Sequence, residues 1–159
     1  MSAKNNQNRK LQKLIDSVKI SDDAVGNAQL GQHQTKTLCF MLDPDSHTVG
    51  AHVLNGLTGA AQSVPINTIV TGYHVDVSDP ITSDGSATIA LGFATDGAAI
   101  VKAATAFDDA SYVAATQKGG VPVASKKLTA ARPLLATVAT AALTAGTMLI
   151  YIQYIESAV

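Results

Sequence analysis

The sequence predicts an all-β protein, an antiparallel β-sandwich or jelly roll of about eight short strands, preceded by an N-terminal arm with a short amphipathic helix. Three observations point to this fold. From Thr37 onward many apolar residues recur with a period of two, which is typical of half-buried strands. Turn sequences rich in Asp, Pro and Gly separate these segments. The segments are short, and short strands with regular turns favour a sandwich or jelly roll.

The composition is poor in charge and in aromatic side chains. Charged residues make up 14% of the chain, well below the usual ~25%. Because so few charges cannot solvate the whole surface of a monomer, we expect part of the surface to be buried in an oligomer. The net charge of −1 provides no positive field for phosphates, so no specific nucleic acid partner is predicted.

Residues 1–34 are rich in Asn and Gln and are predicted to form an arm, whereas residues 35–159 form the β-sandwich domain. In a predicted helix over about residues 9–19, apolar side chains recur at i, i+3, i+4 and i+7 and form one stripe: Leu11, Leu14, Ile15 and Val18. A helix of about three turns is marginal alone in water. The stripe therefore needs a surface, either on its own domain or on a neighbouring subunit, and we expect it to bind a partner.

Period-two alternation and turn sequences set the expected strands. Asp43-Pro44-Asp45 ends the first strand, and Asp79-Pro80 ends the third. Gly119-Gly120 is expected as a turn between two short strands. The expected strands are Thr37–Leu42, Val49–Leu54, Pro65–Ser78, Ser86–Phe93, Tyr112–Ala115, Val121–Ala124, Leu134–Thr140 and Thr147–Ile155.

Two strands allow their faces to be assigned. In Pro65–Ser78 one face is expected to hold Ile69, Thr71, Tyr73, Val75 and Val77, and the other Val70, Gly72, His74 and Asp76. In Ser86–Phe93 the inward residues are expected to be Ala87, Ile89, Leu91 and Phe93.

The segment from Pro133 to Glu156 contains no charge between its ends and is long enough to span a bilayer as a helix. Several Thr residues and the turn-like Thr144-Ala145-Gly146 instead favour a closing β-hairpin. We therefore predict no membrane partner.

Both faces of the last strand are apolar. Met148, Ile150, Ile152 and Tyr154 face one way, and Leu149, Tyr151, Gln153 and Ile155 the other. Either the strand is central and covered on both sides, or its outer face is a subunit interface. We favour the interface, and its expected contacts are Leu149, Tyr151 and Ile155.

Residues that could carry chemistry are sparse. Cys39 lies in an apolar run and is expected to be a buried small hydrophobe, not a nucleophile. His74 and Asp76 share a strand face and could bind a metal, but a solvated face is the favoured interpretation. The segment 43–47 resembles a sparse metal loop but lacks the spacing of a calcium site. Glu156 is the only Glu in the chain. We predict no catalytic residue, no metal site, no cofactor and no enzymatic activity.

Three stretches resemble small structural proteins of tailed bacteriophages. They are Val64-Pro65-Ile66-Asn67-Thr68-Ile69-Val70-Thr71-Gly72-Tyr73-His74-Val75-Asp76-Val77, Ser86-Ala87-Thr88-Ile89-Ala90-Leu91-Gly92, and the region from Arg132 to Gly146 with Tyr151-Ile152-Gln153-Tyr154. The resemblance covers roughly residues 37–156 and is one of strands and turns. It implies a jelly-roll virion protein that decorates or cements the outer surface of the capsid. The implied partners are the major capsid protein and further copies of the chain, with a homotrimer favoured. A head or tail fibre component, or a receptor-binding module, is the alternative.

Overall fold

A computed structural model of the chain describes residues 34–43, 48–93, 100–109, 118–124 and 127–157. Apart from Gln34, the predicted arm lies outside these residues, so its helix and its docking stay predictions. The described residues form nine β-strands and no helix, which confirms the all-β prediction for them. They do not bear out the predicted count of about eight short strands, since one strand has 2 residues and another has 15.

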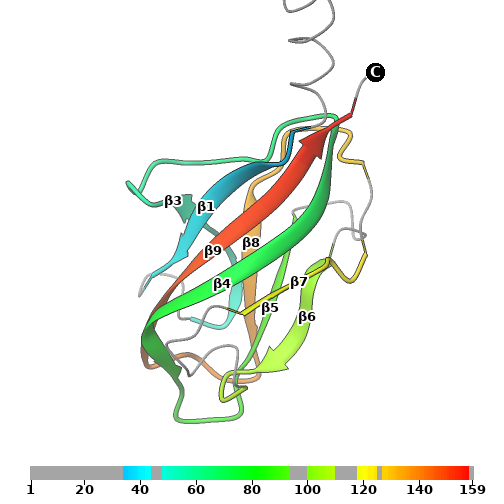
Figure 1. Cartoon of the computed structure of the whole chain (residues 1–159). Coiled ribbons are helices and arrows are strands. Elements are labelled where there is room, and N and C mark those ends of the chain that lie inside the picture. The colour runs from blue at the N-terminus through cyan, green and yellow to red at the C-terminus, as the bar shows by residue number, and fades with distance from the viewer. Residues whose placement is uncertain (1–33, 44–47, 94–99, 110–117, 125–126, 158–159) are drawn as a thin grey trace, which may run out of the picture. The chain divides into compact units, whose positions relative to one another are not determined.

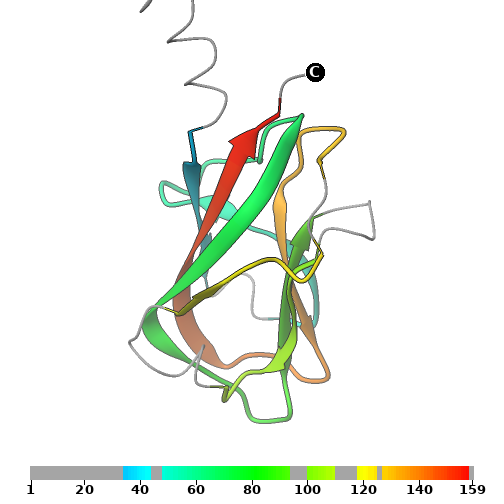
Figure 2. The same ribbon diagram turned by 45° about the vertical axis from the view of Figure 1, so that its right-hand side comes forward.

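The strands form two antiparallel sheets. In chain order they are β1 (Lys36–Leu42), β2 (Gly50–Val53), β3 (Asn55–Gly56), β4 (Thr68–Thr82), β5 (Thr88–Phe93), β6 (Ile100–Ala106), β7 (Lys118–Gly120), β8 (Leu134–Ala139) and β9 (Ala145–Glu156). The first sheet has the order β3-β1-β9-β4-β7 and the second the order β2-β8-β5-β6. The first sheet lies in front in Figure 1, and Figure 2 shows the two sheets as separate layers.

The chain passes repeatedly from one sheet to the other, as in a jelly roll. The predicted closing hairpin is therefore wrong: β8 pairs with β2 and β5, whereas β9 pairs with β1 and β4. The turn between them carries the chain across the core instead of back along the same sheet. Residues 134–156 contain these two strands, and among the described residues no helix is long and apolar enough to cross a membrane.

The core lies between the sheets and is built almost entirely from aliphatic side chains. Its members include the predicted inward residues of the segment Ser86–Phe93, which contains β5: Ala87, Ile89, Leu91 and Phe93. It also includes one predicted face of β9, namely Met148, Ile150, Ile152 and Tyr154. Both face assignments are thus confirmed. Phe40 and Leu42 of β1 complete the layer beside β9.

The predicted faces of β4 are correct only in part, because a β-bulge changes the phase of the strand. The pairing advances from Val70–Tyr154 to Gly72–Gln153, so β4 gains one residue relative to β9 at Thr71. Val70 therefore faces the core, and so do Tyr73, Val75 and Val77 beyond the bulge. By contrast Ile69 pairs with the outward Ile155, and Thr71 is exposed. Simple alternation places these two residues on the wrong face.

β4 also continues past its predicted end at Ser78. Asp79-Pro80 was expected as a turn, yet the strand reaches Thr82 through two further register shifts opposite β9. Proline has no N–H to donate to a ladder, so it is tolerated in a strand where a bulge interrupts the pairing. Beyond it the Ile81 side chain returns to the core.

Gly119 and Gly120 form a strand and not the predicted turn. β7 pairs with Tyr73–Val75 of β4. A Cβ at Gly119 would meet the His74 ring and lie 2.8 Å from the Tyr73 carbonyl oxygen, and a Cβ at Gly120 would lie 3.1 Å from Tyr73 Oη. Glycine is therefore needed here so that β7 can approach β4 closely.

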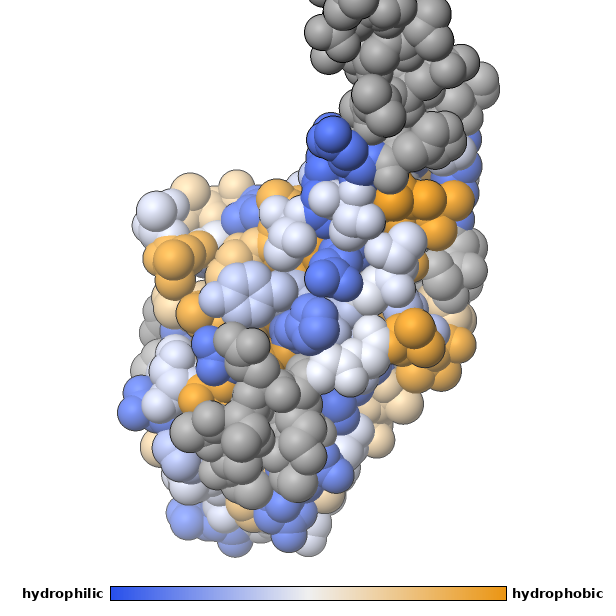
Figure 3. All heavy atoms as spheres, viewed as in Figure 1, coloured by the Kyte–Doolittle hydropathy of each residue, from blue (hydrophilic) through white to orange (hydrophobic). Residues whose placement is uncertain are grey.

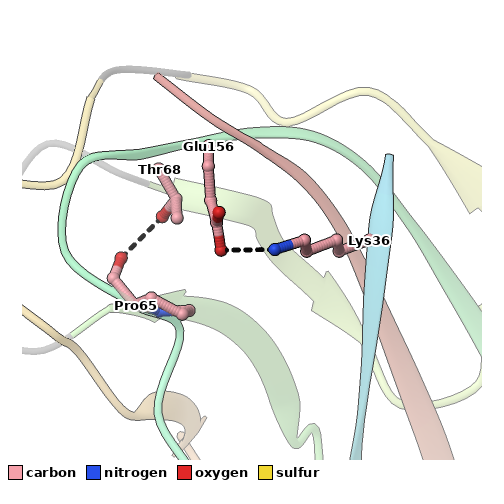
Figure 4. Close-up of polar contacts among 4 residues, drawn as sticks. All are labelled: Lys36, Pro65, Thr68 and Glu156. Carbon is pink, nitrogen blue, oxygen red and sulfur yellow. Dashed lines mark hydrogen bonds and ion pairs between the residues drawn. The ribbon is translucent and has the colours of Figure 1, made fainter. Parts of the chain in front are cut away.

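Polar contacts join the two ends of the sandwich domain. Lys36, at the start of β1, donates a hydrogen bond of 2.7 Å to Glu156 at the end of β9 and forms an ion pair with it (Figure 4). Beside this pair the Thr68 hydroxyl donates to the Pro65 carbonyl oxygen at 2.7 Å. That bond satisfies the Thr68 hydroxyl, which is fully buried.

Candidate functional site

The strands β1, β9 and β4 lie side by side and present one outward face, the β1–β9–β4 face (Figure 1). Cross-strand pairing arranges its residues in three rows: Thr37, Gln153 and Gly72; Cys39, Tyr151 and His74; and Met41, Leu149 and Asp76. Figure 3 shows that hydrophilic and neutral residues occupy much of the middle of this face, while apolar patches lie toward its margins.

The residues predicted as oligomer contacts all lie on this face. Leu149, Tyr151 and Ile155 alternate with the fully buried Ile150 and Ile152, and each is itself half-buried. β9 is central in its sheet, so its flanks are covered by β1 and β4. The structure thus places the three side chains together on one surface, and their contact with a second copy stays a prediction.

An open hollow of about 240 Å³ lies on the β1–β9–β4 face. Its described lining comes from β1, β4 and β9 and consists of Thr37, His74, Tyr151 and Gln153. Thr37 pairs with Gln153, and Tyr151 pairs with His74, so the four come from adjacent rows. The hollow thus combines an aromatic ring with a hydroxyl, an amide and an imidazole.

Gly72 accounts for the position of the Gln153 amide. It stands opposite Gln153 on β4, and a Cβ there would lie 2.7 Å from Gln153 Oε1. The amide therefore lies over the backbone of Gly72, in space that another residue would occupy. A side chain at position 72 would displace this wall of the hollow.

Cys39 and Tyr151 are paired across β1 and β9 beside the hollow, and each affects the pKa of the other. Burial raises the pKa of the Cys39 thiol, and this outweighs the hydrogen bond from Tyr151, which lowers it. The pKa of Tyr151 is also raised, first by the nearby Cys39 and then by burial. Both groups therefore stay neutral at neutral pH. Cys39 is half-buried on the outward face, so its predicted place in the core is wrong: the alternation of β1 turns Phe40 inward instead.

His74 and Asp76 share the outward face of β4, as predicted. Among the described residues no group of three or more His, Cys, Asp or Glu side chains is placed to hold a metal ion. Asp76 raises the pKa of Tyr151 slightly, as the last of its causes, and is the negative charge on the third row of this face. The segment 43–47, which resembles a sparse metal loop but was interpreted as a turn, lies outside the described residues except for Asp43.

The outward face of the second sheet has a different chemistry. Its strands contain one charged residue, Lys102, and small side chains dominate them. Ala51 and Thr137 are exposed there, and Val53 is 54% exposed. Sequence reasoning did not single out this face, although the lack of charge in its strands is a signal visible in the sequence.

Sequence reasoning also missed the hollow. The alternation of β9 places Gln153 beside Tyr151, but the neighbours of β9 cannot be read from that alternation. Thr37 and Gly72 are far from β9 in sequence and meet it only through the sheet order.

No protein-family model matches the chain, and no curated protein sequence matches it either. Solved structures do. A chain in the acidic stable capsid structure of Helicobacter pylori bacteriophage KHP30 is 14% identical, with a TM-score of 0.51, over 78% of this chain and 89% of that chain. A chain in the cyanophage Pam1 capsid asymmetric unit is 16% identical, with a TM-score of 0.51, over 78% and 86%.

A chain in the capsid of Ralstonia phage GP4 is 15% identical, with a TM-score of 0.50, over 80% of this chain and 88% of that chain. In each case most of both chains is covered, so the likeness extends over the β-sandwich and not over one hairpin. At this level of identity the likeness shows the fold: the chain has a jelly-roll-like antiparallel sandwich that also occurs in three phage capsid structures.

Proposed function

We propose that this chain is a structural protein of a phage virion that decorates and cements the outer surface of the capsid. The observation that carries the proposal is the fold, which is shared with chains in three phage capsid structures. The low content of charge, 14% of residues, supports it further, because a decoration protein buries much of its surface against neighbours.

The proposed partner is the major capsid protein, with each copy bound across the seam between its subunits. Such binding adds contact area across the seam and opposes the outward pressure of packaged DNA. Several weak contacts per oligomer then act together through avidity. A homo-oligomer, with a trimer favoured, would bury the β1–β9–β4 face through Leu149, Tyr151 and Ile155.

A binding role and not a catalytic one is proposed for the described surface. The one cysteine, Cys39, has a raised pKa and so remains a protonated thiol, which is a poor nucleophile. No cofactor is invoked.

The direct test is the copy number of the chain in particles of the phage that encodes it, measured by quantitative mass spectrometry against the major capsid protein. Hundreds of copies in a simple ratio to the capsid subunit are expected. About a dozen copies would instead assign the chain to a fibre or tail part, and its absence from the particle would refute the structural role.

The proposed arm gives a second prediction. Its apolar stripe, Leu11, Leu14, Ile15 and Val18, would dock on a neighbouring subunit by helix-in-groove burial. A chain that starts at Gln34 retains the whole described sandwich, so it should fold with an unchanged circular dichroism spectrum but fail to bind capsids that lack the protein. Binding that survives the truncation would refute the anchoring role.

The proposed oligomer gives a third prediction. Tyr151→Asp would bury a new charge in the proposed interface, close to Asp76 on the same face. Size-exclusion chromatography with light scattering should then show a monomer or an aggregate. Thr137→Asp, on the outward face of the second sheet, is the matched control and should leave the oligomer intact. An unchanged oligomer for Tyr151→Asp would exclude the β1–β9–β4 face as the interface.

A receptor-binding module, as in a head or tail fibre, is the second candidate function. The hollow beside Tyr151 favours it, because a shallow site that combines a tyrosine ring with polar side chains suits recognition of a ligand at a surface.

A further inference from the structure

We propose that the hollow on the β1–β9–β4 face is a binding site for a single neutral sugar ring. The described side chains that line it, Thr37, His74, Tyr151 and Gln153, come from three neighbouring strands of one sheet. This inference rests on the receptor-binding candidate and is an alternative to an oligomer that buries the β1–β9–β4 face, because an open site and a buried interface cannot both use Tyr151. It is compatible with cementing through another face.

The volume of the hollow favours a small ligand. Pockets for drug-sized ligands measure roughly 300–1,000 Å³, and this hollow measures about 240 Å³ and is open to solvent. A single ring fits such a space, whereas a longer oligosaccharide would have to extend beyond it along the sheet.

The side chains that line the hollow favour a neutral ligand with several hydroxyl groups. The Tyr151 ring offers an apolar surface on which the C–H face of a pyranose can pack. The Gln153 amide supplies a donor and an acceptor, the His74 ring nitrogens add further hydrogen-bonding groups, and sugar hydroxyls are donors and acceptors as well. Thr37 adds one hydroxyl on the opposite side of Gln153 from Gly72.

Charge argues against an ionic ligand. Thr37, Tyr151 and Gln153 carry no charge at neutral pH, and none of the described lining residues is an arginine or lysine that could bind an anion. The nearest described acid on β4, Asp76, lies one outward position beyond His74 and influences Tyr151. A carboxylate on the ligand would be repelled by Asp76.

The lining is held in place before any ligand arrives. Tyr151 lies beside Cys39, and the two side chains affect each other's pKa. A Cβ at Gly119 would touch the His74 ring, so β7 lies directly against that ring. Gln153 lies over Gly72. Because these side chains are already ordered, binding costs little further conformational entropy.

The test is saturation-transfer NMR on the full chain with methyl glycosides of glucose, galactose, mannose and N-acetylglucosamine. The expected result is binding of at least one of them, with a dissociation constant on the order of 1 mM, as suits a shallow site. Methyl glucuronide is the charged counterpart and should bind more weakly than methyl glucoside.

Two variants assign the binding to the hollow. Tyr151→Leu removes the aromatic ring and should weaken binding about tenfold. Gly72→Ala should weaken it similarly, because the new methyl group displaces the Gln153 amide. If Tyr151→Leu does not fold, Gly72→Ala decides alone. Thr137→Ala, exposed on the second sheet, is the control and should bind as the unaltered chain does.

Three results would overturn the inference: no glycoside binds the folded chain, binding is unchanged in the folded hollow variants, or methyl glucuronide binds as tightly as the neutral sugar. None of these results bears on the copy number in the virion, so the sugar site and the cementing role can fail separately. If the assembled oligomer binds the glycoside through this hollow, its subunit interface has to lie elsewhere.

Discussion

Gly146 occupies a position in β9 that only glycine can fill without a shift of the backbone around it. Its φ is +119°, in the region that L side chains rarely adopt. A Cβ there would also lie 2.5 Å from Ile81 Cα and 2.8 Å from the Pro80 carbonyl oxygen. Both neighbours are backbone atoms of β4, so they cannot move aside as a flexible side chain would.

We therefore expect Gly146→Ala to lower the free energy of unfolding by more than about 2 kcal/mol, since a positive φ alone costs ~1–2 kcal/mol. Gly59→Ala is the matched control: Gly59 has a φ of +76°, but a Cβ there meets nothing within 4 Å. Chemical denaturation should show a clearly larger loss for Gly146→Ala. Equal losses would mean that the contact with β4 contributes nothing.

The sequence indicated a special backbone at Gly146 but not its cause. Thr144-Ala145-Gly146 reads as a turn, and a turn is one reason for a glycine. The close approach of β4 is visible only once the pairing of β4 with β9 is known. The same holds for Gly119, which reads as part of a turn and in fact lets β7 lie against β4.

At the scale of the element, β9 shows two faces of similar hydropathy and different burial. Ile150 and Ile152 are fully buried between the sheets, whereas Leu149 and Tyr151 are half-buried on the outside. The outward face carries Gln153 and is otherwise apolar, so alternation groups the residues of each face but gives only a weak indication of which face is inside. The packing of the two sheets decides, because Ile150 and Ile152 belong to the core between them.

This difference predicts unequal costs for neighbouring substitutions. Ile150→Ala should destabilise the folded domain by about 2–5 kcal/mol, because it leaves a cavity in the core. Leu149→Ala should cost the isolated domain clearly less, because its side chain already meets solvent. Thermal denaturation at low protein concentration compares the two. A loss for Leu149→Ala as large as that for Ile150→Ala would contradict the assignment of the faces.

In β4, simple alternation of inward and outward residues does not predict the faces correctly along the whole strand. Inward and outward faces were predicted correctly for β5, which is short, but β4 has 15 residues and three register shifts against β9. Each shift inserts one residue and reverses the phase that follows. The sequence around Thr71 contains no feature that predicts the bulge. Ile69 and Thr71 were therefore assigned to the wrong face.

At the scale of the whole molecule, the sequence predicted the class of fold but not its connections. Alternation and turns identify strands, and their number and length favour a sandwich. Which strands become neighbours depends on long-range pairing: β9 meets β1, which begins more than a hundred residues earlier. The candidate hollow is a product of that pairing, which explains why Tyr151 was predicted as functional while Thr37 and Gly72 were not.

The ion pair between Lys36 and Glu156 joins the first strand of the sandwich to the last. The hydrogen bond to Glu156 raises the pKa of Lys36 above its ordinary value of 10.5, and burial opposes it more weakly. A group whose pKa is higher in the folded state stabilises that state below its unfolded pKa, and this stabilisation disappears as the pH rises through the folded pKa. The contribution is therefore present at neutral pH and disappears in the alkaline range above 10.5.

Both side chains are partly exposed, 42% for Lys36 and 37% for Glu156, so the effect should be small and screened by salt. Glu156→Gln should lower Tm slightly at neutral pH and low salt, and this difference should shrink both at high salt and as the pH rises past 10.5. Lys36→Met should lower Tm with the same salt and pH dependence, because either substitution removes the ion pair between Lys36 and Glu156. A Tm difference that persists unchanged in strong alkali and in high salt would show that the two residues act through packing at the end of the sheet and not through their charges.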